Sequence, residues 1–191
     1  LLRSRSAIVK DLSRMKQRIK SLLIFYGIPY PPAFEKSATH WSKRFMKWLS
    51  EEVTFSTSQG KEALSLLVNS ACEQRKLLLE ATRKIRELSR TSSYEEPLRL
   101  IRTVPGIGFI TGMTFLTEIE DISRFNNSDK LAGYIGLIPT SHASGEKEGK
   151  GEMTFRGQAQ MKSMLIESSW FAARIDPALS SCFSSLVQRM E

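Results

Sequence analysis

A polar segment at about residues 139–157 holds the side chains best suited to bond making. Its two serines, its histidine and its cations are Ser141, His142, Ser144, Lys147, Lys150 and Arg156. A serine hydroxyl attacks a phosphodiester when its proton is removed and nearby cations neutralise the transition state. Lys150 and Arg156 are the natural candidates for that second role. A serine beside a histidine is also common in a solvated loop, and the residues alone favour that simpler interpretation.

A second motif, VPGIG at 104–108, lies between two segments that are predicted to be helical. It resembles the turn of a helix-hairpin-helix motif, in which glycines allow a tight turn and free N–H groups hold a phosphate oxygen. Thr111 falls in the next helical turn and adds a hydroxyl donor. The same glycines also suit a turn between packed helices. The basic chain favours phosphate binding by Gly106, Gly108 and Thr111, to the backbone rather than the bases.

The acidic residues and cysteines offer little for metal chemistry. Glu118, Glu120 and Asp121 form a tight acidic group, which suits a solvated helix end at least as well as a metal site. Cys72 and Cys182 are too few for a zinc module or a disulfide scaffold. We therefore expect no catalytic metal and no other cofactor within this chain.

The charge of the chain favours a polyanionic partner. Its 191 residues include 28 Lys and Arg against 20 Asp and Glu, a net charge of +8. Such a domain gains free energy on DNA or RNA by releasing condensed counterions, although basic proteins without nucleic-acid partners also exist. No stretch approaches the roughly eighteen apolar residues that cross a bilayer. We expect a cytoplasmic bacterial protein that binds DNA and no membrane.

Two long segments carry apolar residues at alternating steps of three and four, which is typical of a helix seam. In the first segment these residues are Ile8, Leu12, Met15, Ile19, Leu22 and Tyr26. In the second they are Leu64, Leu67, Ala71, Leu78, Ala81, Ile85 and Leu88, with Gln74 as the polar seam position. The period favours a left-handed coiled coil. Its partner is either the first helix, folded back, or a second copy of the chain.

A different pattern begins after Ser92 and Ser93. Helices are predicted at about 95–102, 109–119, 128–136, 158–174 and 177–189, with a long polar loop at 139–157 and no convincing strand. The predicted fold class is all-α. Residues 1–92 form a helical, coiled-coil connector that pairs subunits, and residues 93–191 form a small helical domain with a helix-hairpin-helix-like motif.

Three runs carry a family resemblance: VPGIGFITGMTFLTEIEDISRF, LAGYIGLIPTSHASGEKEGKGEMTFRG and LIESSWFAARIDPAL. In this order they resemble the C-terminal domain of the IS-one-ten transposases, which include the Piv-type DNA invertases. The resemblance covers about residues 97–180. The basic helix, Pro-rich break, Trp-containing helix and long heptad helix before them resemble the coiled-coil connector of that family.

The resemblance implies a role for particular residues. The family serine that becomes covalently joined to DNA precedes a glycine in the loop after the GL-P motif, and Ser144 holds that position. Ser141 is the second choice, because no glycine follows it. Arg156 and Gly157 match the basic RG element of the family, although Phe155 stands where many relatives carry another basic residue. We expect DNA contacts from Lys147, Lys150 and Arg156.

The resemblance also implies parts that this chain lacks. An N-terminal RuvC-like domain with a DEDD set of carboxylates binds two Mg²⁺ ions in the family, and the chain has no such domain. It also lacks an initiator Met, so we expect a longer protein.

In the intact enzyme the resemblance implies DNA cleavage and rejoining through a phosphoserine link. DNA is the expected substrate, a structured guide RNA a second partner, and the coiled coil the route to a homo-oligomer. The present chain is expected to bind DNA without cutting it. The alternative is a non-catalytic helix-hairpin-helix DNA-binding module or coiled-coil scaffold, in which Ser144 is merely a loop residue.

Overall fold

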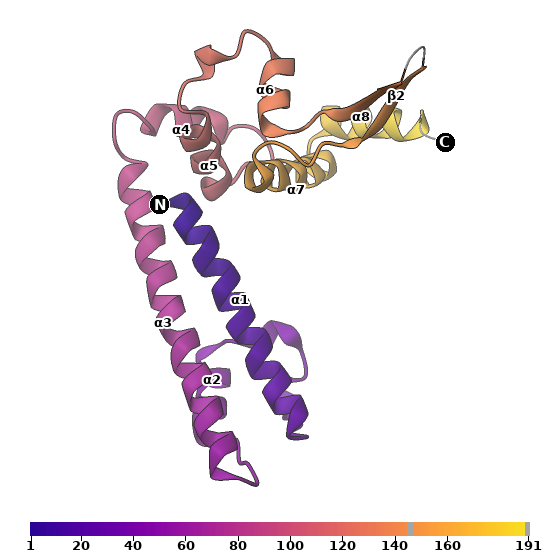
Figure 1. The fold of residues 1–191 in the computed structure, drawn as a ribbon. Coiled ribbons are helices and arrows are strands. Elements are labelled where there is room, and N and C mark those ends of the chain that lie inside the picture. Colours follow the sequence, from indigo (N-terminus) through magenta and orange to yellow (C-terminus); the bar gives the residue numbers. More distant parts are fainter. Residues whose placement is uncertain (145–146, 190–191) are drawn as a thin grey trace. The chain divides into compact units, whose positions relative to one another are not determined.

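The computed structural model describes residues 1–144 and 147–189, and for 141–152 it describes the backbone only. The chain divides into two compact units, unit 1 (Leu1–Arg86) and unit 2 (Glu87–Glu191). Helices dominate both units (Figure 1), so the all-α prediction is confirmed. No helix of the described ranges is long and apolar enough to cross a membrane.

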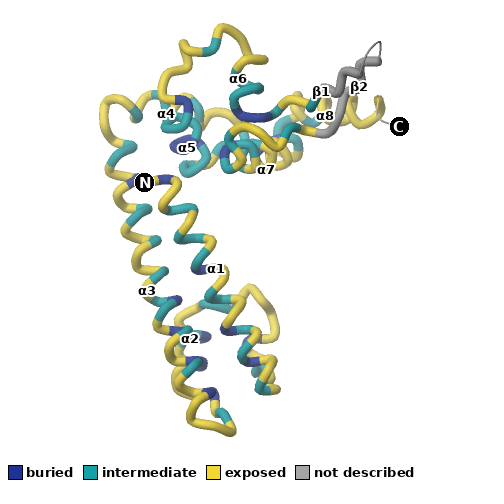
Figure 2. Tube along the Cα trace, viewed as in Figure 1, coloured by how far each residue is buried: buried dark blue, intermediate teal, exposed yellow. Residues whose placement is uncertain are grey.

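Unit 1 is built on two long antiparallel helices, α1 (Leu2–Phe25) and α3 (Ser58–Leu88), which lie side by side (Figure 1). The Arg5 guanidinium Nε near the start of α1 donates a 3.1 Å hydrogen bond to Thr82 Oγ1 near the end of α3. The buried side chains shared by the two helices are Leu12, Ile19, Leu23, Leu64, Val68 and Ala71. Figure 2 shows such buried positions recurring along both helices. The seam of α3 thus packs on the first helix of the same chain.

A connecting segment rich in aromatic residues, 26–57, joins α1 to α3. It contains the 3₁₀ turns η1 (Pro32–Phe34) and η2 (Ser37–Thr39) and the helix α2 (Lys43–Glu51). Ser42 caps α2 by accepting a 3.2 Å hydrogen bond from the Phe45 amide, as N-cap serines do. The apolar face of α2 is buried in the core of unit 1. Trp41, just before the cap, has a φ of +67°, which is uncommon for a residue with a Cβ.

Unit 2 contains five helices in its described part. They are α4 (Glu95–Ile101), α5 (Phe109–Ile119), α6 (Ser128–Ile135), α7 (Ala159–Ile175) and α8 (Pro177–Gln188), with the 3₁₀ turn η3 (Ile122–Arg124) between α5 and α6. Asn127 caps α6 and Asp176 caps α8 with side-chain oxygens. A small core of Ile119, Ile135 and Met161 joins α5, α6 and α7.

The prediction of a long loop at 139–157 is wrong, because the structure has two paired strands there. β1 (Pro139–Ser144) pairs antiparallel with β2 (Lys147–Met153) in a two-stranded ribbon. The segment lacks the apolar alternation that usually reveals a strand, since Gly, Ser, Lys and Glu fill it. The ribbon rests on backbone hydrogen bonds, which any residue except proline can donate.

Candidate functional site

The ribbon places each candidate serine opposite a candidate lysine. In the backbone register Ser144 is the partner of Lys147, and Ser141 is the partner of Lys150. His142 pairs with Gly149. The side chains of these residues lie outside the described part of the chain, so the finding concerns register alone. Sequence distance did not show this pairing, because it depends on where the chain turns.

Two glycines form the neck from which the ribbon extends. Gly136 ends α6 with a φ of +90°, and its amide donates to the Ala132 carbonyl oxygen at 2.9 Å. Gly157 follows β2 with a φ of +101°. The Gln158 amide donates across the neck to the Ile135 carbonyl oxygen at 3.1 Å. The neck therefore fixes both ends of the ribbon to the helices α6 and α7.

Two cations and an aromatic residue lie close to Gly157 in the chain. Arg156 is exposed, and its amide donates to Thr154 Oγ1 at 3.1 Å. Lys162 donates from Nζ to the Thr154 carbonyl oxygen at 2.7 Å. No sequence motif pointed to this lysine. Phe155, which precedes Arg156 in the chain, is 91% exposed. The RG element thus presents Arg156 to solvent, while Lys162 is held by the backbone.

The two glycines of the VPGIG turn have different surroundings. Gly106 has a φ of +85°, and a Cβ there would overlap the carbonyl oxygen of Ser168 in α7. Gly108 is exposed at the N-terminus of α5, with open space where its Cβ would be. No side chain caps α5, and Thr111 lies half-buried in its first turn. Gly106 thus serves close packing on α7, and Gly108 lies at the accessible helix end.

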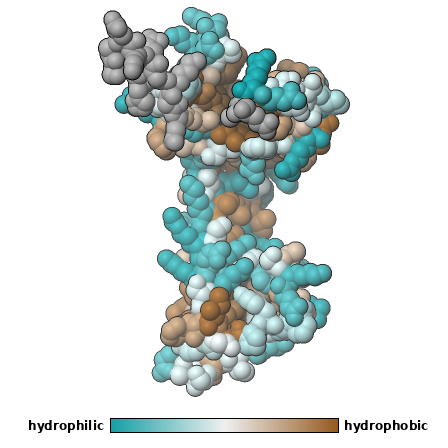
Figure 3. Space-filling view, turned by 90° about the vertical axis from the view of Figure 1, so that its right-hand side faces the viewer, coloured by the Kyte–Doolittle hydropathy of each residue, from teal (hydrophilic) through white to brown (hydrophobic). Residues whose placement is uncertain are grey.

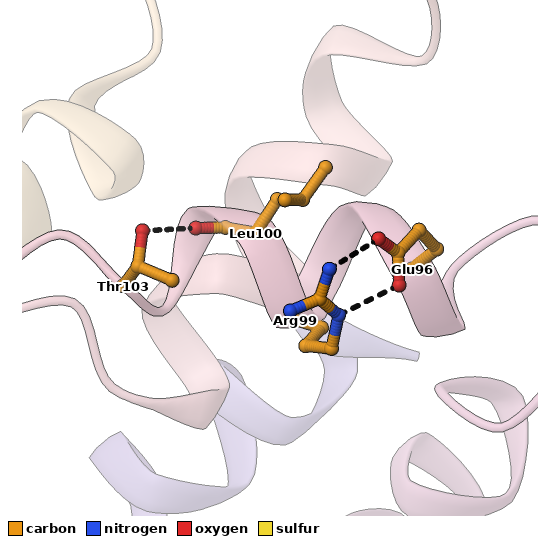
Figure 4. Close-up of polar contacts among 4 residues, drawn as sticks. All are labelled: Glu96, Arg99, Leu100 and Thr103. Atoms are coloured by element: carbon orange, nitrogen blue, oxygen red, sulfur yellow. Dashed lines mark hydrogen bonds and ion pairs between the residues drawn. The ribbon is translucent and has the colours of Figure 1, made fainter.

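In and just after the helix before this turn, the side chains of Glu96, Arg99 and Thr103 are already hydrogen-bonded. Arg99 donates to both carboxylate oxygens of Glu96, at 2.7 and 2.6 Å (Figure 4). This hydrogen bonding lowers the pKa of Glu96. Thr103 Oγ1 donates to the Leu100 carbonyl oxygen at 2.7 Å where α4 ends. Arg99 is therefore occupied by a carboxylate of its own helix.

Of the acidic residues at the end of α5, Asp121 caps the next turn, η3. Asp121 accepts hydrogen bonds from the Ser123 amide at 2.8 Å and from Ser123 Oγ at 2.7 Å. Both bonds lower the pKa of Asp121. Within the described ranges no three His, Cys, Asp or Glu side chains are grouped as metal ligands. Asp121 is therefore engaged by Ser123 at the start of η3.

The predicted site residues fall into two separate places. Gly108 and Thr111 lie at the start of α5, whereas the paired strands extend away from α5 to the opposite side of unit 2 (Figure 1). The structure brings the serines together with Lys147 and Lys150 in one ribbon. It does not bring them to the glycine turn.

Comparison with known proteins shows a similarity over part of the chain. Residues 98–183 match the family model described as Transposase IS116/IS110/IS902 family. This segment, slightly less than half of the chain, is similar to that transposase family. The match contains α5, the ribbon, its glycine neck and α7.

Several known proteins are similar to this chain over about half of its length or more. The protein y4qE of Sinorhizobium fredii is 26% identical over 170 residues, which is 89% of this chain and 39% of that protein. The transposase for insertion sequence element IS1111A of Coxiella burnetii is 24% identical over 169 residues, 88% of this chain and 44% of the transposase. The pilin gene-inverting protein of Moraxella bovis is 36% identical over 93 residues, 48% of this chain and 28% of that protein.

The chain spans well under half the length of these relatives. No solved structure matches it significantly.

Proposed function

We propose that this chain supplies the serine nucleophile for DNA strand cleavage and exchange by an insertion-sequence transposase. The register of Ser144 with Lys147 is the observation that carries the proposal. Directly opposed residues in an antiparallel pair are near neighbours, so this register would suit a lysine that acts beside the reacting serine. Two relatives support the reaction class, since one is a transposase for an insertion sequence and another inverts a pilin gene.

The proposed step is a phosphoryl transfer to serine. The Ser144 hydroxyl loses its proton to a base as its oxygen attacks phosphorus, and a phosphoserine ester forms. One bond from phosphorus to a deoxyribose oxygen breaks, and that oxygen takes up a proton. Lys147, Lys150 and Arg156 neutralise charge on the phosphate oxygens in the transition state. Reversal of the step with a different DNA hydroxyl rejoins the strands.

The glycine turn is proposed as a second DNA contact, of the helix-hairpin-helix type. Gly108 and Thr111 lie at an uncapped helix N-terminus, where unpaired N–H groups and the helix dipole attract a phosphate. Gly106 supports this contact by letting the turn pack closely on α7. The ribbon and the turn would then hold different phosphates of one substrate.

The other parts of the proposal follow from the family resemblance. They are an upstream Mg²⁺-binding domain, a structured RNA partner, and pairing of subunits through the helices of unit 1. The described residues hold no carboxylate group that fits the metal, so no step of this chain is assigned to it.

A recombination assay on the full-length protein tests the proposal. Ser144→Ala is expected to abolish strand exchange, while Ser141→Ala keeps most of it. Full activity of Ser144→Ala would instead favour the alternative, a DNA-binding or scaffold module without a nucleophile.

A further inference from the structure

The positive charge of the chain is concentrated in unit 1. Residues 1–86 contain seventeen Lys and Arg against seven Asp and Glu, whereas residues 87–191 contain eleven against thirteen. The excess that favours nucleic acid thus lies outside the unit that carries the ribbon and the glycine turn. Figure 3 shows polar side chains projecting from both flanks of unit 1, in the lower part of the view.

Two of these cations contact Trp41, and a third is close enough to Lys16 to act on its charge. Lys16 of α1 has its Nζ over the Trp41 ring, 5.4 Å from the ring centre. Arg75 of α3 donates from Nη1 to the Trp41 carbonyl oxygen at 3.2 Å. Lys20 lies one helical turn after Lys16 on α1. One residue therefore positions cations from two helices, through its ring and through its backbone.

These cations lack carboxylate partners, in contrast to others of unit 1. Lys47, Lys76 and Lys84 each pair with a glutamate of the same helix, at 3.7, 2.7 and 2.9 Å. Among the described residues Lys16, Lys20 and Arg75 have no such ion pair. Burial, followed by the positive charges of Arg75 and Lys20, lowers the pKa of Lys16. The chain thus holds like charges together, which costs free energy until an anion binds.

Trp41 is held in a costly conformation. Its φ of +67° lies in the left-handed region, which costs a residue with a side chain about 1 kcal/mol or more. Its ring packs edge-on against Phe45 at 5.3 Å between centroids, so the core of unit 1 stabilises it. Backbone strain beside an unpaired cation cluster is typical of a binding site.

We propose that Lys16 and Arg75, both in contact with Trp41, bind the phosphodiester backbone of a nucleic acid together with the neighbouring Lys20. The site lies in unit 1 and is separate from the ribbon. This proposal and the proposed function both have nucleic acid as the ligand. The present site does not depend on the serine chemistry of the ribbon. Each cation replaces a condensed counterion, so the salt dependence of binding reports how many of them meet phosphates.

The test uses the 191-residue chain with a labelled DNA duplex and, separately, a labelled RNA stem-loop. The site variant is Lys16→Gln/Lys20→Gln/Arg75→Gln. The control variant is Lys47→Gln/Lys76→Gln/Lys84→Gln, which removes the same charge from the same unit but only from cations that are already paired. Fluorescence anisotropy across a salt series gives the affinity and its slope against log salt. Thermal unfolding confirms that both variants fold.

The site variant is expected to bind at least about tenfold more weakly near 0.15 M salt, and its slope to fall by up to about three. The control slope is expected to change by less than about one. A loss of affinity with both polymers, or with one of them, supports the site. A loss with one polymer alone also identifies the ligand. Equal losses in the two variants, or no loss in the site variant, would overturn it. Ser144→Ala is expected to keep the full slope, so this result is independent of the serine proposal.

Discussion

Gly157 lies so close to Gly136 that a Cβ on Gly157 would be 2.7 Å from the Gly136 amide nitrogen. Both residues have positive φ values, +101° and +90°. The contact joins the two ends of the ribbon, because Gly136 precedes β1 and Gly157 follows β2. A side chain at either glycine would force this neck apart. The position of Ser144 therefore depends on two residues that take no part in chemistry.

Substitution of the neck is expected to destabilise unit 2. Gly157→Ala adds a Cβ against backbone atoms in a left-handed conformation, so we expect the free energy of unfolding to fall by about 2 kcal/mol or more. Gly133→Ala is the matched control within α6, where the nearest atom to a new Cβ is Ile138 Cδ1 at 3.8 Å. It is expected to stabilise the helix by about 0.5–1 kcal/mol. Urea denaturation measures the free energy of unfolding of both variants. Equal effects of the two substitutions would contradict the close packing of Gly157 on Gly136.

The glycine turn can be tested by separating packing from phosphate binding. Gly108→Ser supplies an N-cap hydroxyl in open space, so we expect α5 to gain up to about 0.5 kcal/mol. The same hydroxyl occupies N–H groups that a phosphate would use, so affinity for DNA should fall. Gly106→Ala should instead destabilise unit 2, because its Cβ would overlap Ser168. Thermal unfolding and anisotropy on each variant give the two readouts. Unchanged DNA affinity in Gly108→Ser would show that the turn only packs helices.

Tyr30 should make the stability of unit 1 sensitive to alkaline pH. Its hydroxyl is buried without a hydrogen-bond partner, and burial raises its pKa above the ordinary value of 10.0. The protonated phenol therefore favours the folded state. The free energy of unfolding should fall as the pH rises above about 10 toward the raised pKa.

Tyr30→Phe isolates this effect, since other titrating groups are common to both proteins. At neutral pH the variant should be as stable as the original or more stable by up to about 1 kcal/mol, because no hydrogen bond is lost. The difference in its favour should widen above pH ~10 in urea denaturation. A constant difference across that range would contradict the assigned cause.

The strain at Trp41 is measurable with two truncations. Trp41→Gly and Trp41→Ala both remove the ring and its contact with Lys16. Only glycine adopts the φ of +67° without steric cost, so Trp41→Gly should be the more stable of the two by about 1 kcal/mol. In most folded positions alanine is the more stable. If denaturation shows Trp41→Ala to be more stable than Trp41→Gly, the backbone at this position is not strained.

Helices were predictable where apolar spacing and capping residues agree. The bounds expected for α5 match the observed Phe109–Ile119. The partner of α3 could not be predicted, since the same seam suits α1 or a second copy of the chain. The ribbon was missed because backbone pairing and the contact between Gly136 and Gly157 hold it, and neither leaves an apolar pattern.

The candidate sites were predictable in part. Ser144 and Lys147 could be named from the sequence, but their pairing in register is a property of the fold. Trp41 gave no sign of its positive φ, which results from packing against Phe45 and the start of α2. The net charge was visible, but its concentration in unit 1 became meaningful only when the boundary between the units was known.

The most direct test of the proposed nucleophile is a search for a covalent protein–DNA adduct. The full-length protein would react with a DNA substrate that carries the junction of the element, with and without the proposed RNA. The mixture would be denatured during the reaction, and any adduct would be mapped by mass spectrometry. The account predicts a phosphoserine link to DNA at Ser144 that disappears in Ser144→Ala. Cleavage without any adduct, or an adduct at Ser141 alone, would contradict it.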